Sequence, residues 1–372
     1  MQTALLAGAF GQGNLGDDAL VDSFRHALPS WRVVATAEDA PSPSRHDSDV
    51  VASRRRGLIV RQMLSSDAVV MGGGTLFKTL HPSTQRRPLG LLANAAVLAL
   101  GASLSQRRIA MVGVGAGQLD GPGAIRLSRV LVRCADLLVL RDEESAYELA
   151  QAGVPGPFRV GADPAWTLLR APESARPPGP SKVLVVPSHL ATGSGTYEHM
   201  VDRLISTVDC LSNLGVEVHM QPWQVSMAWR QDDTAIVDRV VAGAAHRVRP
   251  LPVPSSLVDA VATMGTHGAV LAFRFHALVA AGAAGVPSVA VAHEPKMSGL
   301  TRRLGQRMVA TEFDPEHLAT EVLAALASPG PAPALVKSEI DRAEESFRLL
   351  RVLLSQGASE EAESMGALPL VP

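Results

Sequence analysis

The sequence is poor in cysteine and in lysine. Its 372 residues include two cysteines, Cys134 and Cys210, which are too few for a disulfide framework or for a zinc site made of thiolates. Only four of the 34 basic residues are lysine, so the composition is biased towards arginine. A lysine that persists in such a chain is a candidate for a role that arginine cannot fill.

The net charge is also small, and long apolar runs are absent. The 34 basic and 36 acidic residues give a net charge of −2, which gives no indication of nucleic-acid binding. The longest apolar stretch, 89–103, is shorter than the roughly 18 residues of a membrane-spanning helix and contains Asn94. It predicts a buried helix, with an interfacial membrane helix as the alternative. Met1 leads directly into an apolar strand, so we expect no signal peptide and a cytoplasmic protein.

Several common site patterns are missing. His267, His276 and His293 lie on separate segments, and the sequence contains neither H-x-x-x-H nor H-E-x-x-H. The serine elbow G-x-S-x-G and the Walker loop that ends in G-K-S/T are absent too. We therefore expect neither a metal nor an organic cofactor.

Short β-rich apolar runs alternate with helical segments along almost the whole chain. Such alternation is typical of a parallel sheet with helices on both faces. At about 150 residues per domain, the length predicts two domains. We therefore expect an α/β protein of two doubly wound, Rossmann-like domains that face a cleft, as in GT-B-type transferases. The expected strands are 3–7, 32–35, 68–71, 108–112, 136–140, 158–160, 182–186, 217–221, 269–273 and 288–291.

Two proline-rich segments divide the chain. Residues 170–180 read RAPESARPPGP and predict a linker, and 329–334 read PGPAPA before a long amphipathic helix. The expected parts are an N-terminal Rossmann-like domain at 1–170, a linker at 171–180, a C-terminal Rossmann-like domain at 181–330, a helix at 335–355 and a disordered tail at 357–372.

Ligands of open α/β sheets bind beyond the carboxyl ends of the strands, so the residues there are candidate site residues. The first expected strand runs into a glycine-rich segment that contains Asn14, Gly16, Asp17 and Asp18. Two aspartates at a helix N-terminus would repel a phosphate, so we discount dinucleotide binding. Asn14 and the aspartates hydrogen-bond sugar hydroxyls on one interpretation, and on the other Asp17 only caps the helix.

Two further candidates follow strands of the N-terminal half. The segment Gly72-Gly73-Gly74-Thr75 either presents backbone amides to an anion or a close substrate, or forms only a tight turn. Arg141 lies at the start of a helix, which is the unfavourable end for a cation. It either binds an anion or pairs with the acidic residues that follow it.

The most informative segment is the apolar run 269–273, which leads directly into Arg274 and His276. Burial of both side chains without partners would cost much free energy. Because they are two residues apart, they can point to the same side and form an anion-binding and acid/base pair. The alternative is a histidine whose hydrogen bonds are satisfied in the core. After the next strand, Glu294 and Lys296 open a helix, and Lys296 is either an anion ligand or an ordinary surface lysine.

Together these segments resemble the polysaccharide pyruvyl transferase family. The matching motifs occur in family order over roughly residues 1–310. They are Gly13-Asn14-Leu15-Gly16-Asp17-Asp18-Ala19, Gly72-Gly73-Gly74-Thr75, Leu140-Arg141-Asp142 with Ser145, Gly161-Ala162-Asp163-Pro164, Arg274-Phe275-His276 and Glu294-Pro295-Lys296. The sequence departs from the family at Asp18, where glutamate is frequent, at Lys78-Thr79, where an acid often closes the motif, and at Ala272-Phe273, which replaces a commoner Gly-Met.

The resemblance implies a GT-B-like fold and the transfer of pyruvate from phosphoenolpyruvate to a sugar, with a cyclic ketal as product. It also implies donor-site roles for Arg141, Arg274, His276 and Lys296. Phosphoenolpyruvate carries a carboxylate and a phosphate, which suits bidentate contacts from arginine. We expect His276 to act as the acid or base, Lys296 to bind phosphate or to be the alternative acid, and the two arginines to hold the donor.

The acceptor sugar would be held mainly by the N-terminal domain, opposite the donor. The expected substrate contacts are Asn14, Gly16, Asp17, Asp18, Gly73, Gly74, Thr75 and Glu294. The sugar would belong to a cell-surface polysaccharide or to its lipid-linked precursor, and a lipid-linked acceptor would bring a cytoplasmic enzyme to the inner face of the membrane. Two other functions fit the same fold: a nucleotide-sugar glycosyltransferase and a non-catalytic glycan-binding or assembly protein.

Overall fold

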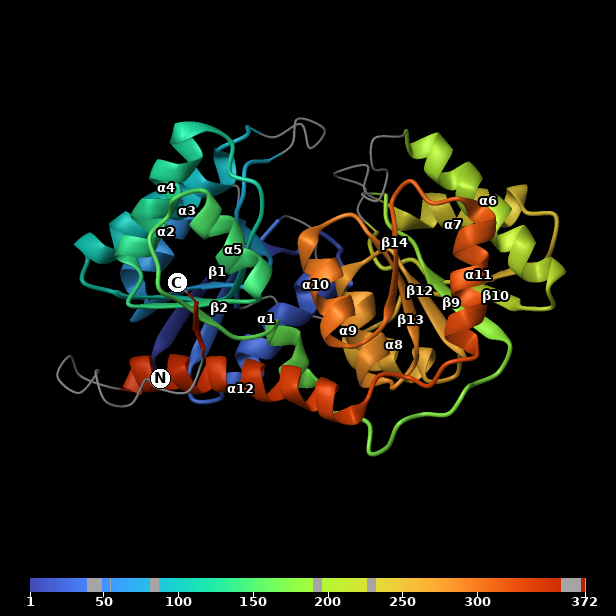
Figure 1. The fold of residues 1–372 in the computed structure, drawn as a ribbon. Helices are drawn as coiled ribbons and strands as arrows, with labels where there is room; N and C mark the ends of the chain where they lie inside the picture. Colours follow the sequence, from blue (N-terminus) through green and yellow to red (C-terminus); the bar gives the residue numbers. More distant parts are fainter. Residues whose placement is uncertain are drawn as a thin grey trace. The chain divides into compact units, whose positions relative to one another are not determined.

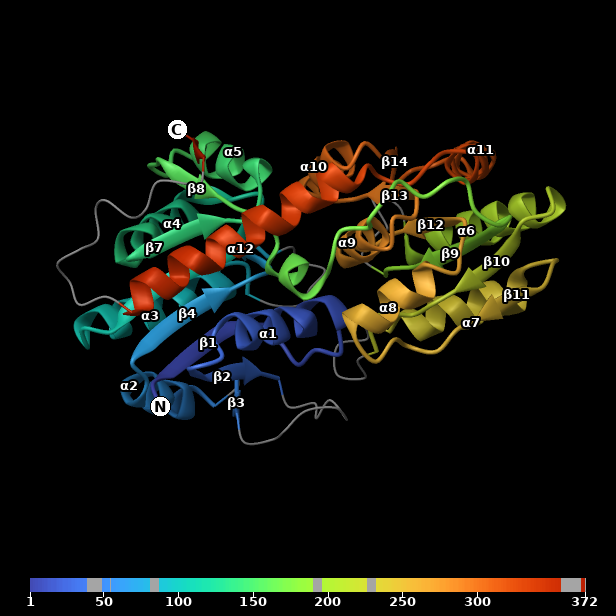
Figure 2. The same cartoon turned by 90° about the horizontal axis from the view of Figure 1, so that it is seen from below.

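The computed structural model of the chain describes residues 1–38, 49–53, 55–80, 87–189, 196–225, 232–355 and 369–371 (Figures 1 and 2). The chain divides into two compact units. The N-terminal unit comprises residues 1–11, 20–167 and 339–372, and the C-terminal unit comprises residues 12–19 and 168–338. Each unit is built around its own sheet.

The sheet of the N-terminal unit is parallel except for its last strand. The order of its strands is β15-β8-β7-β6-β4-β1-β2-β3, and β5 pairs with β6 beside this path. From β1 the chain builds outwards through β2 and β3 and then resumes on the other side with β4, so the order reverses between β1 and β4. The strands are β1 (Thr3–Phe10), β2 (Arg32–Ala37), β3 (Val50–Ala52), β4 (Ala68–Gly72), β5 (Thr75–Phe77), β6 (Arg108–Ala116), β7 (Leu137–Leu140), β8 (Phe158–Val160) and β15 (Leu370–Val371).

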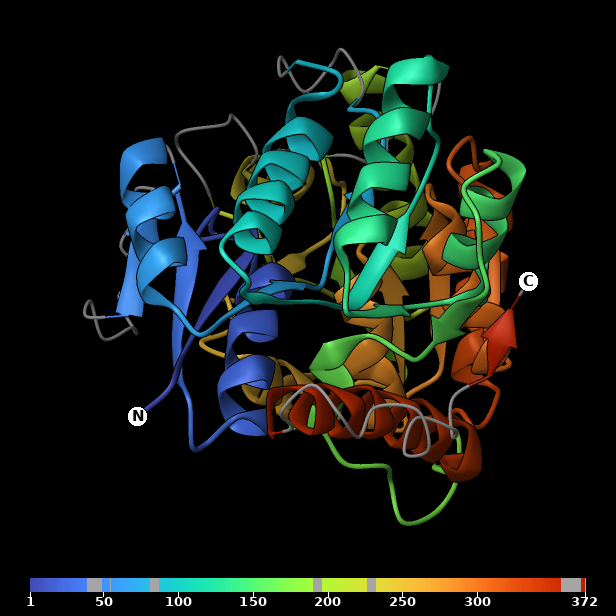
Figure 3. The same ribbon diagram turned by 90° about the vertical axis from the view of Figure 1, so that its left-hand side faces the viewer.

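Helices cover both faces of this sheet, as Figure 3 shows. Helices α2 (Arg56–Ser65), α3 (Gly90–Leu104) and α4 (Gly121–Cys134) lie on one face, and α1 (Leu15–Ala27) and α12 (Pro333–Ser355) lie on the other. Phe24 of α1 and Phe347 of α12 stack edge to face with ring centroids 4.9 Å apart. Helix α5 (Glu143–Gln151) connects β7 to β8, and a short 3₁₀ helix covers Pro164–Leu168.

The C-terminal unit contains a six-stranded parallel sheet in the order β11-β10-β9-β12-β13-β14. This is the order of a dinucleotide-binding Rossmann domain, and it reverses between β9 and β12. The strands are β9 (Lys182–Val186), β10 (Glu217–Met220), β11 (Val248–Pro250), β12 (Ala269–Ala272), β13 (Ser288–Ala292) and β14 (Arg307–Ala310). The helices are α6 (Tyr197–Asn213), α7 (Asp233–Gly243), α8 (Leu257–Met264), α9 (Phe275–Ala283), α10 (Pro295–Arg303) and α11 (Pro315–Leu326).

The central strands are buried on both sides, which is why they read as continuous apolar runs in the sequence. Helices α6, α7 and α11 share one core with one face of the second sheet, where Val185, Leu271 and Val291 are fully buried. Right-handed crossovers place α8, α9 and α10 on the opposite face, and α9 contacts both of its neighbours. All ten expected strands are present, and the prediction of two Rossmann-like α/β units is confirmed.

The units differ from the predicted division in three places. Residues 12–19 group with the C-terminal unit rather than with the N-terminal one. The predicted linker packs on the C-terminal unit, where the backbone N–H of Gly330 donates to the carbonyl of Arg176. Leu370 and Val371 of the predicted disordered tail form β15, which pairs antiparallel with β8. The tail residues 357–368 and 372 lie outside the described part of the chain.

The apolar stretch predicted as a buried helix is α3, and only one side of it is buried. Leu92, Ala95 and Ala99 face the core of the N-terminal unit, whereas Val97 and Leu104 are exposed. Within the described ranges, no helix combines the length and the apolarity needed to cross a membrane.

Candidate functional site

The predicted site residues fall into two groups. The C-terminal unit carries Asn14, Gly16, Asp17, Asp18, Arg274, His276, Glu294 and Lys296, and the N-terminal unit carries Gly73, Gly74, Thr75 and Arg141. In the first group, Arg274 and His276 follow β12, where the strand order of the sheet reverses, which is the usual ligand-binding position in an open α/β sheet. Glu294 and Lys296 follow the neighbouring strand β13.

Arg274 follows β12 and is the N-cap residue of α9. Its guanidinium is buried and forms a two-point contact with the carboxylate of Asp233, with Nε 2.7 Å from Oδ2 and Nη2 2.6 Å from Oδ1. Nε also donates to the Pro187 carbonyl, and Nη2 donates to Oε1 of Gln224. These contacts fix the plane of the guanidinium and use two of its three nitrogens.

Asp233 is the residue that organises this part of the unit. It is fully buried in the first turn of α7 and also accepts hydrogen bonds from the backbone N–H groups of Trp223 and Gln224. Burial acts to raise the pKa of Asp233, but the Arg274 guanidinium and the hydrogen bonds from His189 and Arg274 hold that pKa below its ordinary value. Asp233 is therefore a carboxylate that carries charge inside the protein.

His189 follows β9 and lies on the other side of Asp233, with Nδ1 3.5 Å from Oδ1. Its Nε2 is buried and has no hydrogen-bond partner among the residues that the structure describes. An imidazole that is oriented by a carboxylate at one nitrogen and unsatisfied at the other is suited to contact a ligand.

Residues 12–19 lie against this strand edge. The backbone N–H of Leu15 donates to the Trp223 carbonyl, and that of Val225 donates to the Gly13 carbonyl. Gly16 is buried against the ring of His276, so closely that a Cβ atom at this position would overlap Nδ1. The segment expected to face the donor from the opposite domain therefore contacts the donor-side histidine.

Asn14, and not Asp17, caps α1. Its Oδ1 accepts from the backbone N–H of Gly16 at 3.1 Å, and its Nδ2 donates to Oδ2 of Asp17 at 2.9 Å. Asp17 and Asp18 are half-buried in the first turn of the helix. The capping role considered for Asp17 is thus filled by Asn14.

Lys296 lies in the first turn of α10 and forms an ion pair with Glu294. Its Nζ is also 5.7 Å from the ring centroid of Phe275, the residue between Arg274 and His276. His293 precedes this pair, and burial, the largest cause, lowers its pKa although the charge of Glu294 acts to raise it. Within the described ranges, Nδ1 of His293 is buried without a hydrogen-bond partner.

The glycine-rich segment of the N-terminal unit joins β4 to β5. Gly73 and Gly74 have φ values of +64° and +67°, which an L-residue rarely adopts, and the carbonyl of Gly74 accepts from the N–H of Gly115. A tight turn is therefore present, and whether Thr75 and the turn amides also contact a ligand stays a prediction.

Arg141 is buried at the end of β7, in the same unit. Its Nε is 2.9 Å from Oδ2 of Asp142, and its Nη1 is 3.7 Å from Oδ2 of Asp163. Burial acts to raise the pKa of Asp142, but Arg141 and two hydrogen bonds from Ser145 hold it below its ordinary value. Gly115 leaves room for the guanidinium, because a Cβ there would overlap Nη2.

Sequence reasoning missed Asp233, His189 and Gln224. The signal for Asp233 was a pair of aspartates, Asp232 and Asp233, at the start of a helix. Aspartate is common at helix N-termini, so the pair did not by itself indicate a functional site. His189 carried a clearer signal, because it closely follows a buried strand in the same way as Arg274 does.

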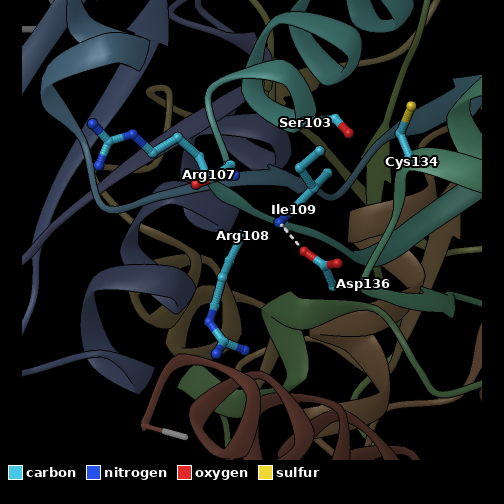
Figure 4. Close-up of a pocket in the computed structure, with 7 residues that line it drawn as sticks. Ser103, Arg107, Arg108, Ile109, Cys134 and Asp136 are labelled. Atoms are coloured by element: carbon cyan, nitrogen blue, oxygen red, sulfur yellow. Dashed lines mark hydrogen bonds between the residues drawn. The ribbon is translucent and has the colours of Figure 1, made fainter. Parts of the chain in front are cut away.

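A pocket of about 340 Å³ lies elsewhere in the N-terminal unit (Figure 4). Arg107, Arg108 and Ile109 line it at the start of β6, and Oδ2 of Asp136 accepts from the Ile109 N–H at 2.7 Å. It opens at the amino end of the strand, so none of the predicted site residues lines it. No group of three histidine, cysteine or acidic side chains suited to a metal ion occurs in the part of the chain that the structure covers.

Comparison with known protein families identifies the chain. The sequence profile of the polysaccharide pyruvyl transferases matches residues 14–295. The chain belongs to the polysaccharide pyruvyl transferase family. The matched region includes every predicted site residue except Lys296, which follows it directly. No curated protein matches the chain in a search by similarity.

The chain is similar in fold to several solved structures that contain UDP or a UDP-sugar. The UDP complex of Staphylococcus aureus MnaA has a TM-score of 0.63 at 12% identity and covers 96% of this chain and 98% of its own. The UDP-GlcNAc 2-epimerase of Methanocaldococcus jannaschii has a TM-score of 0.61 at 12% identity, with 96% and 100% covered. Anabaena HepE with UDP-glucose has a TM-score of 0.59 at 12% identity, with the same coverage. This pyruvyl transferase family member therefore has the GT-B fold.

Proposed function

We propose that the protein transfers the pyruvyl group of phosphoenolpyruvate to two hydroxyls of a sugar, with a cyclic ketal and phosphate as products. The sugar would belong to a cell-surface polysaccharide or to its lipid-linked precursor. Family membership supports a pyruvyl transferase, and one observation in the structure carries the donor assignment. Arg274 and His276 follow the strand at which the sheet order reverses, and Lys296 opens the helix after the neighbouring strand.

A donor with three negative charges requires cations whose geometry is fixed before it binds. The contact with Asp233 orients Arg274, and Nη1 is the guanidinium nitrogen that makes no hydrogen bond within the described ranges. This nitrogen is available for the carboxylate or phosphate of the donor. The ion pair of Lys296 with Glu294 is partly exposed, so it contributes little stability and an incoming phosphate can replace the carboxylate.

The proposed reaction needs one proton delivered and two removed. A proton from His276 or Lys296 is added to C3 of the enol, which makes C2 electrophilic. A sugar hydroxyl then attacks C2 and loses its proton, and the bond between C2 and the phosphate oxygen breaks. The second hydroxyl attacks C2 and loses its proton, which closes the ketal. Of the two protons released, one replaces the proton delivered to C3 and the other is taken up by the phosphate that leaves.

The acceptor is proposed to bind beside residues 12–19. Asp17 and Asp18 are carboxylates that can accept hydrogen bonds from sugar hydroxyls, and Gly16 of the same turn contacts His276. A hydroxyl held by these carboxylates would lie near the acid/base residue. Gly73, Gly74 and Thr75 of the N-terminal unit remain proposed substrate contacts, and Arg141 of the same unit remains a proposed donor contact.

The decisive experiment is a transfer assay in D₂O. Purified protein is incubated with phosphoenolpyruvate and a panel of nucleotide-linked and lipid-linked hexoses and N-acetylhexosamines. We expect phosphate release and a ketal methyl group that carries one deuterium from solvent, detected by NMR and mass spectrometry. If no acceptor supports phosphate release, pyruvyl transfer is wrong for this protein.

A nucleotide-sugar glycosyltransferase is the second candidate, because the solved structures of similar fold contain UDP or UDP-sugars. Calorimetric titration separates the two functions. Binding of phosphoenolpyruvate without UDP supports pyruvyl transfer, and binding of UDP without phosphoenolpyruvate supports the glycosyltransferase.

A further inference from the structure

The charges of this near-neutral chain are distributed very unevenly. Residues 50–119 contain nine of its 34 lysines and arginines but only one of its 36 acidic residues, Asp67. The whole chain has a net charge of −2, so the remainder is acidic. A segment of this kind presents a local basic surface that the net charge hides.

Two neighbouring helices of this segment also expose apolar side chains. Helices α2 and α3 contact one another on the same face of the N-terminal sheet (Figure 3). Val97 is 67% exposed and Leu104 is 86% exposed, which is unusual for large apolar residues on regular helices. The α2–α3 face, as we name it, consists of Leu58, Val60 and Leu64 on α2 and Val97, Leu100 and Leu104 on α3.

Exposed arginines lie on α2 among these apolar side chains, and neither helix contains an acidic residue. Arg55, Arg56 and Arg61 are exposed at the start and along the side of α2. Nη2 of Arg107 donates to the Leu64 carbonyl at 3.0 Å, so the turn after α3 is joined to the end of α2. The exposed apolar and basic residues thus lie on two contacting helices of a single unit.

We propose that the α2–α3 face docks the protein on an anionic lipid bilayer. Apolar side chains that project from a helix surface enter the boundary between head groups and acyl chains, while arginines contact lipid phosphates. A second copy of the chain is a poorer occupant, because two such faces would bring like charges together. The inference stands independently of the transfer reaction, since none of these residues belongs to the proposed donor or acceptor site.

Vesicle flotation tests the docking surface directly. The full-length protein is mixed with vesicles of phosphatidylglycerol and phosphatidylethanolamine, or of phosphatidylcholine alone. We expect binding to the anionic vesicles only, and weaker binding as salt is raised. Equal binding to both vesicle types, or to neither, overturns the proposal.

Two pairs of substitutions locate the surface. Val97→Glu with Leu104→Glu removes the apolar contact, and Arg55→Glu with Arg61→Glu reverses two charges. Each arginine near an anionic leaflet strengthens binding about fivefold, so the second pair should weaken binding by at least about 25-fold. Val258→Glu on α8 is the matched control, because Val258 is also an exposed valine on a helix but lies outside the face.

Circular dichroism checks that each variant is folded. Sedimentation measures self-association in parallel. The proposal would be overturned if the unsubstituted protein forms a dimer and does not bind anionic vesicles, and if Val97→Glu with Leu104→Glu dissociates that dimer. Such a result would show that a second copy covers the face. Anionic binding that neither pair of substitutions weakens would also overturn the proposal.

Discussion

Gly16 lies directly against the imidazole of His276, with no room between them for a side chain. The two residues are far apart in sequence, and the backbone hydrogen bonds of residues 13–15 to the loop after β10 hold them together. The turn proposed to bind the acceptor and the histidine proposed to move a proton are therefore parts of one packed unit.

Gly16→Ala tests this contact. The added methyl group must displace the imidazole or the turn, and small displacements of a catalytic group cost about 100-fold in rate. We expect turnover to fall by about that factor while circular dichroism shows a retained fold. Gly90→Ala is the control, since its Cβ would meet only Arg87, at an ordinary 3.6 Å. If Gly16→Ala turned over as fast as the unsubstituted protein, the position of His276 would have no effect on the reaction.

Asp233→Asn should destabilise the protein strongly. It leaves the buried Arg274 guanidinium without its counter-charge, and such losses cost about 3–5 kcal/mol of unfolding free energy. The neighbouring Asp232→Asn is the matched control, because asparagine caps a helix as well as aspartate does. Urea unfolding followed by tryptophan fluorescence measures both. Equal stability of the two variants would show that the buried ion pair contributes nothing.

His189→Ala leaves the ion pair of Arg274 with Asp233 in place. We therefore expect a smaller loss of stability than in Asp233→Asn, together with weaker binding of phosphoenolpyruvate or a lower turnover, because the unsatisfied Nε2 is lost. Comparison of KM with kcat separates the two effects. Unchanged kinetics would show that His189 has only a structural role.

Substitutions at Lys296 separate its two proposed roles. Lys296→Met removes the charge, and the loss of a hydrogen bond to a charged group should raise the KM for phosphoenolpyruvate about 10- to 100-fold. Lys296→Arg keeps the charge but does not release a proton at neutral pH. If Lys296 only binds phosphate, Lys296→Arg should restore most of the activity. If Lys296→Arg restores binding but not kcat, then Lys296 is the proton donor.

A pair of buried histidines in the C-terminal unit predicts a pH-dependent stability. His267 Nε2 is 3.0 Å from His219 Nδ1, and burial, the largest cause, lowers the pKa of His267 to about 4. The unfolded chain takes up this proton near pH 6.5 and the folded chain does not, so stability falls as the pH drops from about 6.5 towards 4. The loss should be on the order of 2 kcal/mol. Urea midpoints across this pH range measure it, and His267→Leu should flatten the dependence.

The sequence predicted the central strands because burial on both faces requires unbroken apolar residues. It did not predict β3, β5, β11 or β14, which are only three or four residues long. The outer strands β3, β11 and β14 also contain exposed or charged positions, such as Arg249 and Arg307. Edge strands of this kind are defined by pairing with a neighbour rather than by composition. The tail strand β15 was missed for the same reason.

The site was predictable where polar residues interrupt an apolar run, as Arg274 and His276 do. Asp233 was not, because its partner lies 41 residues away and its own position looks like a helix cap. The grouping of residues 12–19 with the C-terminal unit depends on contacts with Trp223 and His276, which no local pattern encodes.

The pairing of each cation with its own carboxylate has a consequence for the energetics of ligand binding. Arg274 with Asp233 and Lys296 with Glu294 form neutral pairs, so an anion that enters adds uncompensated charge beside His189, His276 and His293. Binding should then draw a proton from solution onto His293, whose pKa burial lowers below its ordinary value. Titration calorimetry in buffers of different ionisation enthalpy would count the protons taken up for each phosphoenolpyruvate bound.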